Sequence, residues 1–285
     1  MLRNLRTYHR PTDLQEALRL IRQPGTVPLG GGTRLIPSGD ASVTAVVDLS
    51  RLGLSYIESE MRALCIGATT TLQELVASPD VTDFASGIVR EAASLSAARN
   101  IRNQATLGGW LASAGPADPL PVVLLALDAR LTVWAPEERT VPIGSFLAYR
   151  ERLLSGDSLI TEIALPRAFG AVGYGFERVA RTPRDRPIVC AAAFIALHDE
   201  RCQTARLALG GVADHALRLQ QAEQRLAGRT LSEPLIAEVA EIGAQTLDPP
   251  GDYLGSSEYR REMAAVLARR ALLGAWQGAR AVGSG

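Results

Sequence analysis

Two glycine-rich segments of this chain have the residue types and spacing that could bind an anionic ligand. Gly30-Gly31-Gly32-Thr33 follows a short apolar run, and Thr106-Leu107-Gly108-Gly109 has the same character later in the chain. Glycine accepts positive φ and has no Cβ, so successive backbone N–H groups in such a run can converge on one anion. Each segment alone is more typical of a tight turn. The two together favour a site that cradles an extended dinucleotide from two sides.

Other nucleotide motifs and metal sites are poorly supported. The chain has no G-x-G-x-x-G fingerprint and no G-K-[ST] ending, which disfavours a Rossmann NAD site and a P-loop. All thirty basic residues are arginine, which excludes Schiff-base chemistry on a lysine of this chain. The few thiols and imidazoles are scattered without ligand spacing, at Cys65, Cys190, Cys202, His9, His198 and His215. The sequence therefore predicts no metal centre and three reduced, mostly buried thiols.

Composition sets the general class of protein. The chain has 285 residues, zero formal net charge, 47% apolar residues and 21% charged residues. It offers no net attraction to nucleic acid or to an anionic membrane surface. The N-terminus lacks the apolar core of a signal peptide, and no run approaches the roughly 20 apolar residues of a membrane span. We expect a cytoplasmic protein of two domains with no membrane span.

The pattern of elements indicates an α+β protein. Thr12-Asp13-Leu14-Gln15 and Thr71-Leu72-Gln73-Glu74 have the form of capping boxes that open helices. Further helices are expected over 88–95, 232–244 and 256–276, and strands over 27–29, 45–47, 131–134, 159–165, 188–197 and 205–209. The second glycine segment is expected in a loop between apolar segments. The change of pattern places a domain boundary near 170–175.

Five stretches carry a resemblance to a known family: PLGGGTRLIPSG, IGATTTLQELVASPDV, ARNIRNQATLGGWLASAGPADPLPVVLLALDA, LALGGVADHALRL and DPPGDYLGSSEYRREMAAVLARRAL. In this order they resemble the medium, FAD-binding subunit of molybdenum hydroxylases, the flavoprotein family of carbon monoxide dehydrogenase and xanthine dehydrogenase. The resemblance implies a two-part FAD-binding domain of the vanillyl-alcohol-oxidase (PCMH) type over 1–172, with subdomains of about 1–55 and 56–172. A smaller α+β C-terminal domain over 173–285 would follow.

The resemblance also implies residues that contact FAD. Pro28 to Leu35 would form one FAD loop and Thr106 to Trp110 a second, around the pyrophosphate and the ribityl chain. Arg178 stands where the family usually has a lysine, and a surface salt bridge is its alternative role. The expected cofactor-binding residues are Pro28, Leu29, Gly30, Gly31, Gly32, Thr33, Arg34, Leu35, Thr106, Leu107, Gly108, Gly109, Trp110, Asp118, Ile160 and Arg178. No catalytic side chain and no metal ligand are expected.

This chain departs from the family pattern at four positions. Trp110 replaces a serine or asparagine, and Pro119 replaces an aspartate. Asp118, one position earlier, either takes the place of that aspartate or faces water. Arg34 replaces an acidic or polar residue and adds a charge that favours a phosphate. Ser113-Ala114-Gly115-Pro116 differs from the common H/N-A-D/S-P. These changes leave open a reshaped FAD site, a weaker one, or a loop adapted to another electron acceptor.

The resemblance implies a role in a three-subunit oxidoreductase. A large subunit would hold a molybdopterin cofactor and oxidise the substrate, and a small subunit would carry two [2Fe-2S] clusters. FAD on this chain would pass electrons to NAD, oxygen or a quinone. Two alternatives are a stand-alone FAD-dependent oxidoreductase, whose flavin a substrate would bleach without partners, and a structural subunit that has lost FAD and is colourless.

Overall fold

A computed structural model of the chain describes residues 2–135, 137–156, 158–183 and 185–283. Its internal contacts define two compact units. The first unit comprises Met1–Asp80, Ala97–Ala114 and Ala129–Leu165, and the second comprises Val81–Ser96, Gly115–Asp128 and Pro166–Gly285. Each unit is thus assembled from separate stretches of the chain. The domain division at residue 172 stays a prediction.

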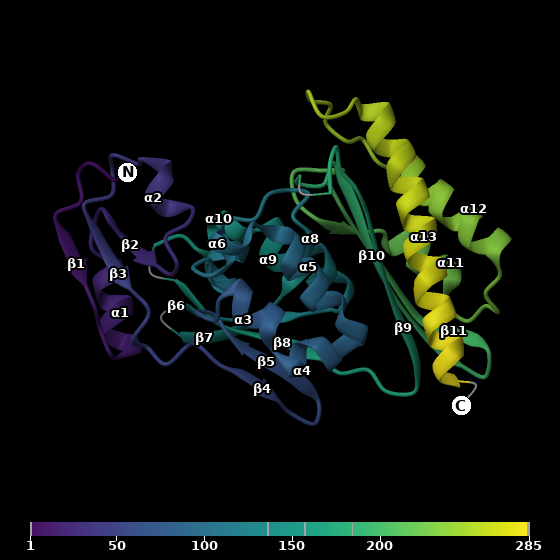
Figure 1. Ribbon diagram of the computed structural model, residues 1–285, viewed down its shortest axis with the longest axis horizontal. Coiled ribbons are helices and arrows are strands. Elements are labelled where there is room, and N and C mark those ends of the chain that lie inside the picture. The colour runs from purple at the N-terminus through teal and green to yellow at the C-terminus, as the bar shows by residue number, and fades with distance from the viewer. Residues whose placement is uncertain (1, 136, 157, 184, 284–285) are drawn as a thin grey trace. The chain divides into compact units, whose positions relative to one another are not determined.

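The first unit begins with a small parallel sheet. Its strands β1 (Thr7–His9), β3 (Ala45–Asp48) and β2 (Thr26–Leu29) pair in that order. Helix α1 (Leu14–Ile21) connects β1 to β2, and α2 (Leu35–Ser38) lies between β2 and β3, so the chain crosses over between successive parallel strands. The parallel strands lie side by side at the purple end of the ribbon (Figure 1).

The cap of α1 differs from the prediction by one residue. Asp13 is the N-cap and accepts a hydrogen bond from the Glu16 amide at 2.9 Å, whereas Thr12 was expected in that role. Aspartate is at least as good an N-cap as threonine, so the helix begins after Asp13 and not after Thr12. The second expected capping box is confirmed at the start of α3 (Leu72–Ala77). The Thr71 hydroxyl accepts a hydrogen bond from the Glu74 amide, and the Glu74 carboxylate accepts one from the Thr71 amide.

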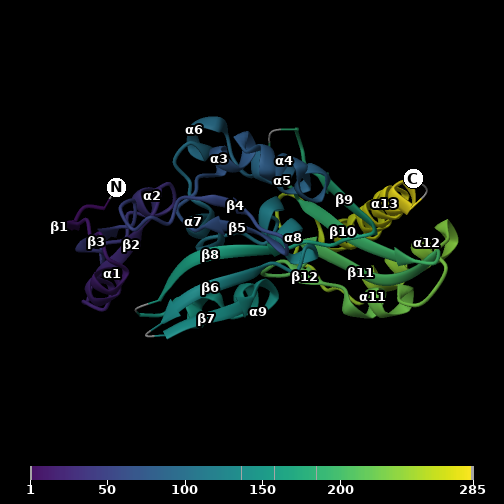
Figure 2. The ribbon, with the colours of Figure 1, turned by 90° about the horizontal axis from the view of Figure 1, so that it is seen from below.

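A five-stranded sheet forms the rest of the first unit's β structure. Its order is β4 (Ile57–Ser59), β5 (Ala63–Gly67), β8 (Leu159–Pro166), β6 (Arg130–Ala135) and β7 (Glu137–Pro142). Figure 2 shows β8, β6 and β7 running side by side. The helices of this part are α3, α6 (Arg99–Arg102), α7 (Leu107–Ala112), α9 (Ile143–Ala148) and α10 (Arg150–Leu153).

A bulge interrupts the pairing of β8 with β6. Thr132 pairs with Glu162 but the next residue, Val133, pairs with Ile160, so Thr161 is an extra residue in β8. The Thr161 carbonyl accepts a hydrogen bond from the Ala68 amide at 2.9 Å. This hydrogen bond from the segment after β5 to the bulged residue holds that segment against the start of β8.

The second unit is built on an antiparallel sheet. Strands β12 (Leu217–Arg218), β11 (Arg201–Gly210), β10 (Val189–His198) and β9 (Ala171–Val179) pair in that order. Helix α13 (Ser257–Gly283) packs along β9 and β10, and both views show it beside these strands (Figures 1 and 2). The other helices are α4 (Pro79–Asp83), the 3₁₀ turn η1 (Phe84–Gly87), α5 (Ile88–Ser96), α8 (Pro119–Ala126), α11 (Gln220–Leu226) and α12 (Glu233–Gln245).

Small residues permit the close packing of α13 on β9. A Cβ added at Gly175 would lie 2.1 Å from the Ala271 carbonyl oxygen, and one at Gly173 would lie 2.0 Å from that of Ala275. Ala271 and Ala275 are themselves buried in the core of the unit. The helix backbone therefore lies directly on the strand, with no room for a side chain on this face of β9.

The α+β class is confirmed, and one expected loop is wrong. The expected strands fall within β2, β3, β6, β8, β10 and β11, and the expected helices within α5, α12 and α13, apart from single residues at some ends. Residues 107–110 of the second glycine segment, however, lie in helix α7. The Thr106 hydroxyl caps this helix at the Gly109 amide, which allows two consecutive glycines to stay helical.

The three thiols are reduced and buried, as expected. Burial raises the pKa of the Cys65 and Cys202 thiols to about 11, and it also raises that of Cys190. We predict that none of the three reacts with a disulfide reagent at neutral pH until the chain is unfolded, because reaction needs an accessible thiolate. A thiol count by Ellman's reagent with and without denaturant tests this. Rapid native labelling of even one thiol would contradict the burial.

Two general features of the described residues bear on possible sites. No group of three or more histidine, cysteine, aspartate or glutamate side chains among them could hold a metal ion. Within the same stretches, none of the helices combines the length and apolarity needed to cross a membrane.

Candidate functional site

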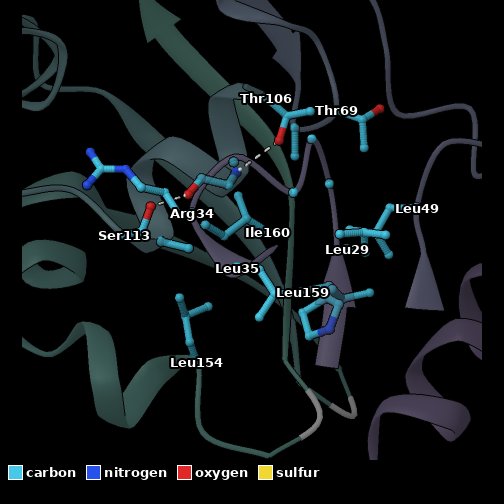
Figure 3. Close-up of a pocket in the computed structure, with 18 of the residues that line it drawn as sticks. Leu29, Arg34, Leu35, Leu49, Thr69, Thr106, Ser113, Leu154, Leu159 and Ile160 are labelled. Atoms are coloured by element: carbon cyan, nitrogen blue, oxygen red, sulfur yellow. Dashed lines mark hydrogen bonds between the residues drawn. The ribbon is translucent and has the colours of Figure 1, made fainter. Parts of the chain in front are cut away.

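A cavity of about 380 Å³ lies within the first unit. Its wall is formed by five segments: the chain from β2 into α2, the residue after β3, the turn after β5, helix α7 with its cap, and the chain from the end of α10 into β8 (Figure 3). The described lining residues are Pro28, Leu29, Gly30, Gly31, Gly32, Thr33, Arg34, Leu35, Ser38, Leu49, Ala68, Thr69, Thr106, Gly108, Gly109, Ala112, Ser113, Leu154, Gly156, Ser158, Leu159 and Ile160. Volumes of about 300–1,000 Å³ are typical of ligand pockets.

The first glycine segment offers unpaired backbone donors to this cavity. Within the described part of the chain, the amides of Gly30, Gly31, Gly32 and Thr33 donate no hydrogen bond. Gly32 has a positive φ of 68°, which turns the chain toward α2. Consecutive free N–H groups around such a turn form a nest that favours an anion. The expectation of an anion-binding loop after β2 therefore has a physical basis in this structure.

Close packing fixes the position of the first glycine segment. A Cβ added at Gly31 would lie 1.6 Å from the Gln104 carbonyl oxygen, and one at Gly30 would lie 2.6 Å from the Thr106 hydroxyl oxygen. The segment therefore lies directly against the chain that leads into α7. Glycine is required at Gly31, because a side chain there would enter the space of the neighbouring backbone, whereas at Gly30 it would meet a side chain.

The second glycine segment has a different role. Its amides are already paired, since Leu107 N donates to Thr70 O, Gly108 N to Ala68 O and Gly109 N to the Thr106 hydroxyl. Figure 3 shows the Thr106 and Ser113 hydroxyls both hydrogen-bonded to Gly109. A Cβ at Gly108 would lie 2.9 Å from that of Ala68. These glycines allow α7 to approach the cavity, and they leave few amides for a ligand.

The turn after β5 is held from two sides. Ala68 and Thr69 line the cavity, and their amides donate to Thr161 O and Leu54 O, each at 2.9 Å. The neighbouring Thr70 hydroxyl bonds to both backbone groups of Tyr56, and the Tyr56 hydroxyl donates to the Glu162 carboxylate at 2.8 Å. Burial and that carboxylate raise the pKa of Tyr56, which keeps the phenol protonated as a donor. The turn is thus rigidly positioned.

Leucines form the apolar part of the wall. Leu29, Leu49 and Leu159 come from β2, from the residue after β3 and from the start of β8 (Figure 3). Leu49 and Leu159 also belong to the buried cluster on which α1 packs. The Leu49 amide donates to Leu29 O at 3.0 Å. The cavity therefore has polar donors at the glycine loop and an apolar surface beside it.

Asp48 holds the turn that carries Leu49. It is buried and accepts hydrogen bonds from the Tyr8 hydroxyl at 2.7 Å and the Ser50 amide at 2.9 Å, and Arg10 lies 3.1 Å away. Burial alone would raise the pKa of this carboxyl, but the hydrogen bonds and the Arg10 charge outweigh it, so the pKa falls below its ordinary value. The ionised form is therefore the one that the fold stabilises.

We predict that Asp48→Asn lowers the free energy of unfolding at pH 7 by about 1–2 kcal/mol, because charge-assisted hydrogen bonds are lost. A depressed native pKa stabilises the fold above the unfolded value of about 3.9 and loses this effect as pH falls through the native pKa. The difference between variant and parent should therefore shrink below about pH 4. Denaturant unfolding from pH 7 to pH 3 measures it. A constant difference across this range would contradict the assignment.

The structure brings most of the expected site residues together. The whole segment Pro28 to Leu35 lines the cavity, as do Thr106, Gly108, Gly109 and Ile160. Leu107 and Trp110 are buried in α7 and are not among the lining residues.

Asp118 and Arg178 belong to the second unit. Asp118 is 3% exposed and accepts from the Gly115 amide at 2.8 Å, so it does not face water. Arg178 donates to the carbonyls of Pro183 and Asp185. A role of either residue toward a cofactor stays a prediction.

Several lining residues were missed. Ala68, Thr69, Ala112 and Ser113 lie inside the stretches that carry the family resemblance, so that signal could have included them. Leu154, Gly156 and Ser158 lie in the connection from α10 to β8, whose composition resembles any surface loop. Their position depends on how β8 enters the sheet, which no local pattern encodes.

Comparison with known proteins assigns the family. The family described as "FAD binding domain in molybdopterin dehydrogenase" matches residues 3–168, more than half of the chain. The chain belongs to this family. Residues 174–275 match a second family, described as "CO dehydrogenase flavoprotein C-terminal domain". The protein is thus a medium, FAD-binding subunit of the molybdenum hydroxylase type, and its resemblance to that family is confirmed.

Relatives of this FAD-binding subunit match over nearly their whole length. The glyceraldehyde dehydrogenase medium chain of Sulfolobus acidocaldarius is 31% identical over 273 residues, which cover 93% of this chain and 96% of that protein. The carbon monoxide dehydrogenase medium chain of Hydrogenophaga pseudoflava is 30% identical and covers 94% and 96%. The solved carbon monoxide dehydrogenase of H. pseudoflava superposes with a TM-score of 0.90 at 29% identity, covering 98% and 99%. The chain is therefore an oxidoreductase subunit.

The cavity fits an FAD-binding subunit on its own geometry. The nest from Gly30 to Thr33 suits an anionic group, and a side chain at Gly30 or Gly31 would collide with the chain leading into α7. The leucine wall beside it suits an apolar ring or chain. We therefore take this cavity as the candidate place for the cofactor.

Proposed function

We propose that this chain is the electron-transfer subunit of a molybdenum hydroxylase complex and that it binds FAD in the cavity of its first unit. Electrons would reach it from [2Fe-2S] clusters of a small partner subunit, after a molybdopterin-containing large subunit has oxidised the substrate. They would leave to an external acceptor such as NAD, oxygen or a quinone. When bound, FAD supplies the redox chemistry, since it exchanges electrons singly or in pairs.

The observation that carries the proposal is the set of unpaired amides from Gly30 to Thr33 at the cavity wall. Each hydrogen bond from such a group to a charged oxygen contributes about 1.5–3 kcal/mol. These amides would hold the pyrophosphate of FAD, and the Thr33 and Thr106 side chains lie on the same wall. The leucines would exclude water from the apolar part of the cofactor.

The lining side chains are suited to binding rather than to proton transfer. Among the described lining residues Arg34 is the one charged side chain, and none is a histidine, an acid or a cysteine. A general acid or base needs a titratable group within hydrogen-bond reach of the reacting atom. The cavity therefore supports a protein that positions a redox cofactor and leaves proton chemistry to the cofactor and to other subunits.

The relatives differ in the substrates that their names give, although they match this chain over nearly their whole length. Their names refer to glyceraldehyde, carbon monoxide and 6-hydroxypseudooxynicotine dehydrogenases. A substrate pocket would have to differ among such different compounds, whereas the medium subunits remain similar. This supports the placement of substrate oxidation in a partner subunit, with the present chain as the route for electrons.

The first test is the absorption spectrum of the purified chain, followed by acid release and chromatographic identification of any flavin. An oxidised flavin spectrum with FAD in the supernatant is the expected result. A colourless chain that also fails to take up added FAD would overturn the proposal and favour a structural subunit.

A second test examines the route of the electrons. The chain is co-expressed with candidate molybdenum and iron–sulfur subunits from the same organism, and flavin bleaching is followed after substrate is added. We expect bleaching in the complex and none in the isolated chain with the same substrate. Bleaching of the isolated chain would show a stand-alone oxidoreductase instead.

A further inference from the structure

Arg34 and Trp110 form a stacked pair at the wall of the cavity. The guanidinium carbon of Arg34 lies 4.6 Å from the centroid of the Trp110 ring system. Arg34 lines the cavity, whereas Trp110 is 3% exposed and lies behind the wall in α7. A guanidinium at this distance from an indole face is attracted by the ring's negative π surface, and its plane is restricted by the stack.

Trp110 is a rigid support for this contact. It belongs to a helix whose N-terminal amides are held by Thr70, Ala68 and Thr106. Its indole Nε1 is buried and has no hydrogen-bond partner among the described residues. An unpaired buried donor is unfavourable, so the fold does not retain this tryptophan for its N–H group. The ring face under Arg34 is the interaction that the structure does show.

Arg34 belongs to the same cavity-lining loop as the glycine nest. Arg34 directly follows the four unpaired amides of Gly30 to Thr33 and begins α2 as its N-cap residue. It carries the one positive charge among the described lining residues, and no described acidic side chain lines the cavity. The loop therefore carries a cation as well as backbone donors, and both kinds of group bind phosphate oxygens.

We infer that Arg34, oriented by its stack on Trp110, is a positioning residue that recognises the phosphate portion of the bound dinucleotide. This inference rests on the proposed binding of FAD in the cavity. The N-cap residue of α2 would supply the cation, and Trp110 in α7 would supply the aromatic surface that orients it.

The test compares the affinity of the flavin-free chain for three ligands: FAD, ADP and riboflavin, which lacks phosphate. Arg34→Met is expected to weaken FAD and ADP binding about tenfold, as for loss of one hydrogen bond to a charged oxygen, and to leave riboflavin binding unchanged. Arg34→Lys keeps the charge and should weaken FAD and ADP less than Arg34→Met. Raising the salt concentration should weaken ADP binding more in the parent than in Arg34→Met.

The stack is tested through Trp110. Trp110→Phe keeps an aromatic face and removes the unpaired N–H, so FAD affinity should stay within about threefold of the parent. Trp110→Leu removes the face and should weaken FAD about as much as Arg34→Met. Because both changes remove one interaction, the double variant should bind FAD no more weakly than either single variant.

Several results would overturn the inference while leaving FAD binding intact. Equal affinities of the parent and Arg34→Met for FAD and ADP would exclude a phosphate role. An equal loss for riboflavin would show that Arg34 only shapes the cavity, and additive losses in the double variant would show that Trp110 does not act through Arg34. If Trp110→Leu fails to fold, the Arg34 variants and the three ligands still decide the question. A parent chain that binds no FAD would instead contradict the proposed function.

Discussion

Gly31→Ala is expected to weaken FAD binding by about 100-fold or more, which corresponds to loss of one or two hydrogen bonds to a charged oxygen. The added Cβ would lie 1.6 Å from the Gln104 carbonyl oxygen, which belongs to the backbone and cannot rotate away. The glycine segment must therefore move away from the chain that leads into α7. The unpaired amides of this cavity-lining segment would then be displaced.

A graded series separates this effect from a general loss of stability. At Gly30 the added Cβ would meet the Thr106 hydroxyl at 2.6 Å, and a side chain can rotate, so Gly30→Ala should weaken FAD less than Gly31→Ala. Gly274→Ala is the matched control, because its Cβ would have no neighbour closer than 3.9 Å on an exposed part of α13. It should retain FAD fully and leave stability equal or slightly higher.

The measurements are the FAD content after purification, the dissociation constant for added FAD, and the unfolding midpoint of each variant. Overpacking of this kind destabilises a fold by about 1–3 kcal/mol, so Gly31→Ala should still fold. Full retention of FAD by folded Gly31→Ala would remove the first glycine segment from the site. Equal losses in Gly31→Ala and Gly274→Ala would show an unspecific effect.

The first glycine segment was predictable because its chemistry is local. Gly30 to Thr33 follow a short apolar strand, and a run of residues without Cβ is by itself a reason to expect backbone donors. The structure adds what the sequence did not contain, namely that the Gln104 carbonyl lies against Gly31. That contact joins residues far apart in the chain, so no local pattern reports it.

The second glycine segment shows the limit of the same reasoning. Gly108 and Gly109 look like the first pair in composition, yet their amides are paired with Ala68 and Thr106. Whether a glycine serves a ligand or serves close packing depends on the neighbouring strand and turn. Sequence composition cannot separate these two uses. The same holds for Trp110, whose burial and stack on Arg34 follow from tertiary structure.

The C-terminal signature is a further case in which the sequence marked the right residues without giving their role. The stretch from Asp248 to Leu272 carries the family resemblance, and Arg260 lies in its middle. In the structure Arg260 is 5% exposed and connects three separated segments. Its guanidinium donates to Ile188 O at 2.7 Å, to Gly211 O at 2.9 Å and to the Asp252 carboxylate at 2.7 Å.

Arg260→Met should therefore be among the most destabilising substitutions in the second unit. It leaves two buried carbonyls without this donor, and each such loss typically destabilises by about 1–3 kcal/mol. Asp252 also loses its partner, although its side chain is 44% exposed and water compensates for part of that loss. We expect the free energy of unfolding to fall by at least about 2 kcal/mol, with the start of β10 and the end of β11 loosened first.

Arg261→Met is the matched control on the neighbouring residue. Arg261 donates to Leu247 O at 3.0 Å and lies 3.6 Å from Asp248, whose side chain is 99% exposed, so its removal should lower stability by well under half as much. Denaturant unfolding compares the variants, and hydrogen exchange at Val189 and Gly210 locates the loosened region. Equal destabilisation by the two substitutions would mean that Arg260 does not act through its buried contacts. We expect Arg260→Met to retain FAD, because the Arg260 hydrogen bonds and the cofactor cavity belong to different units.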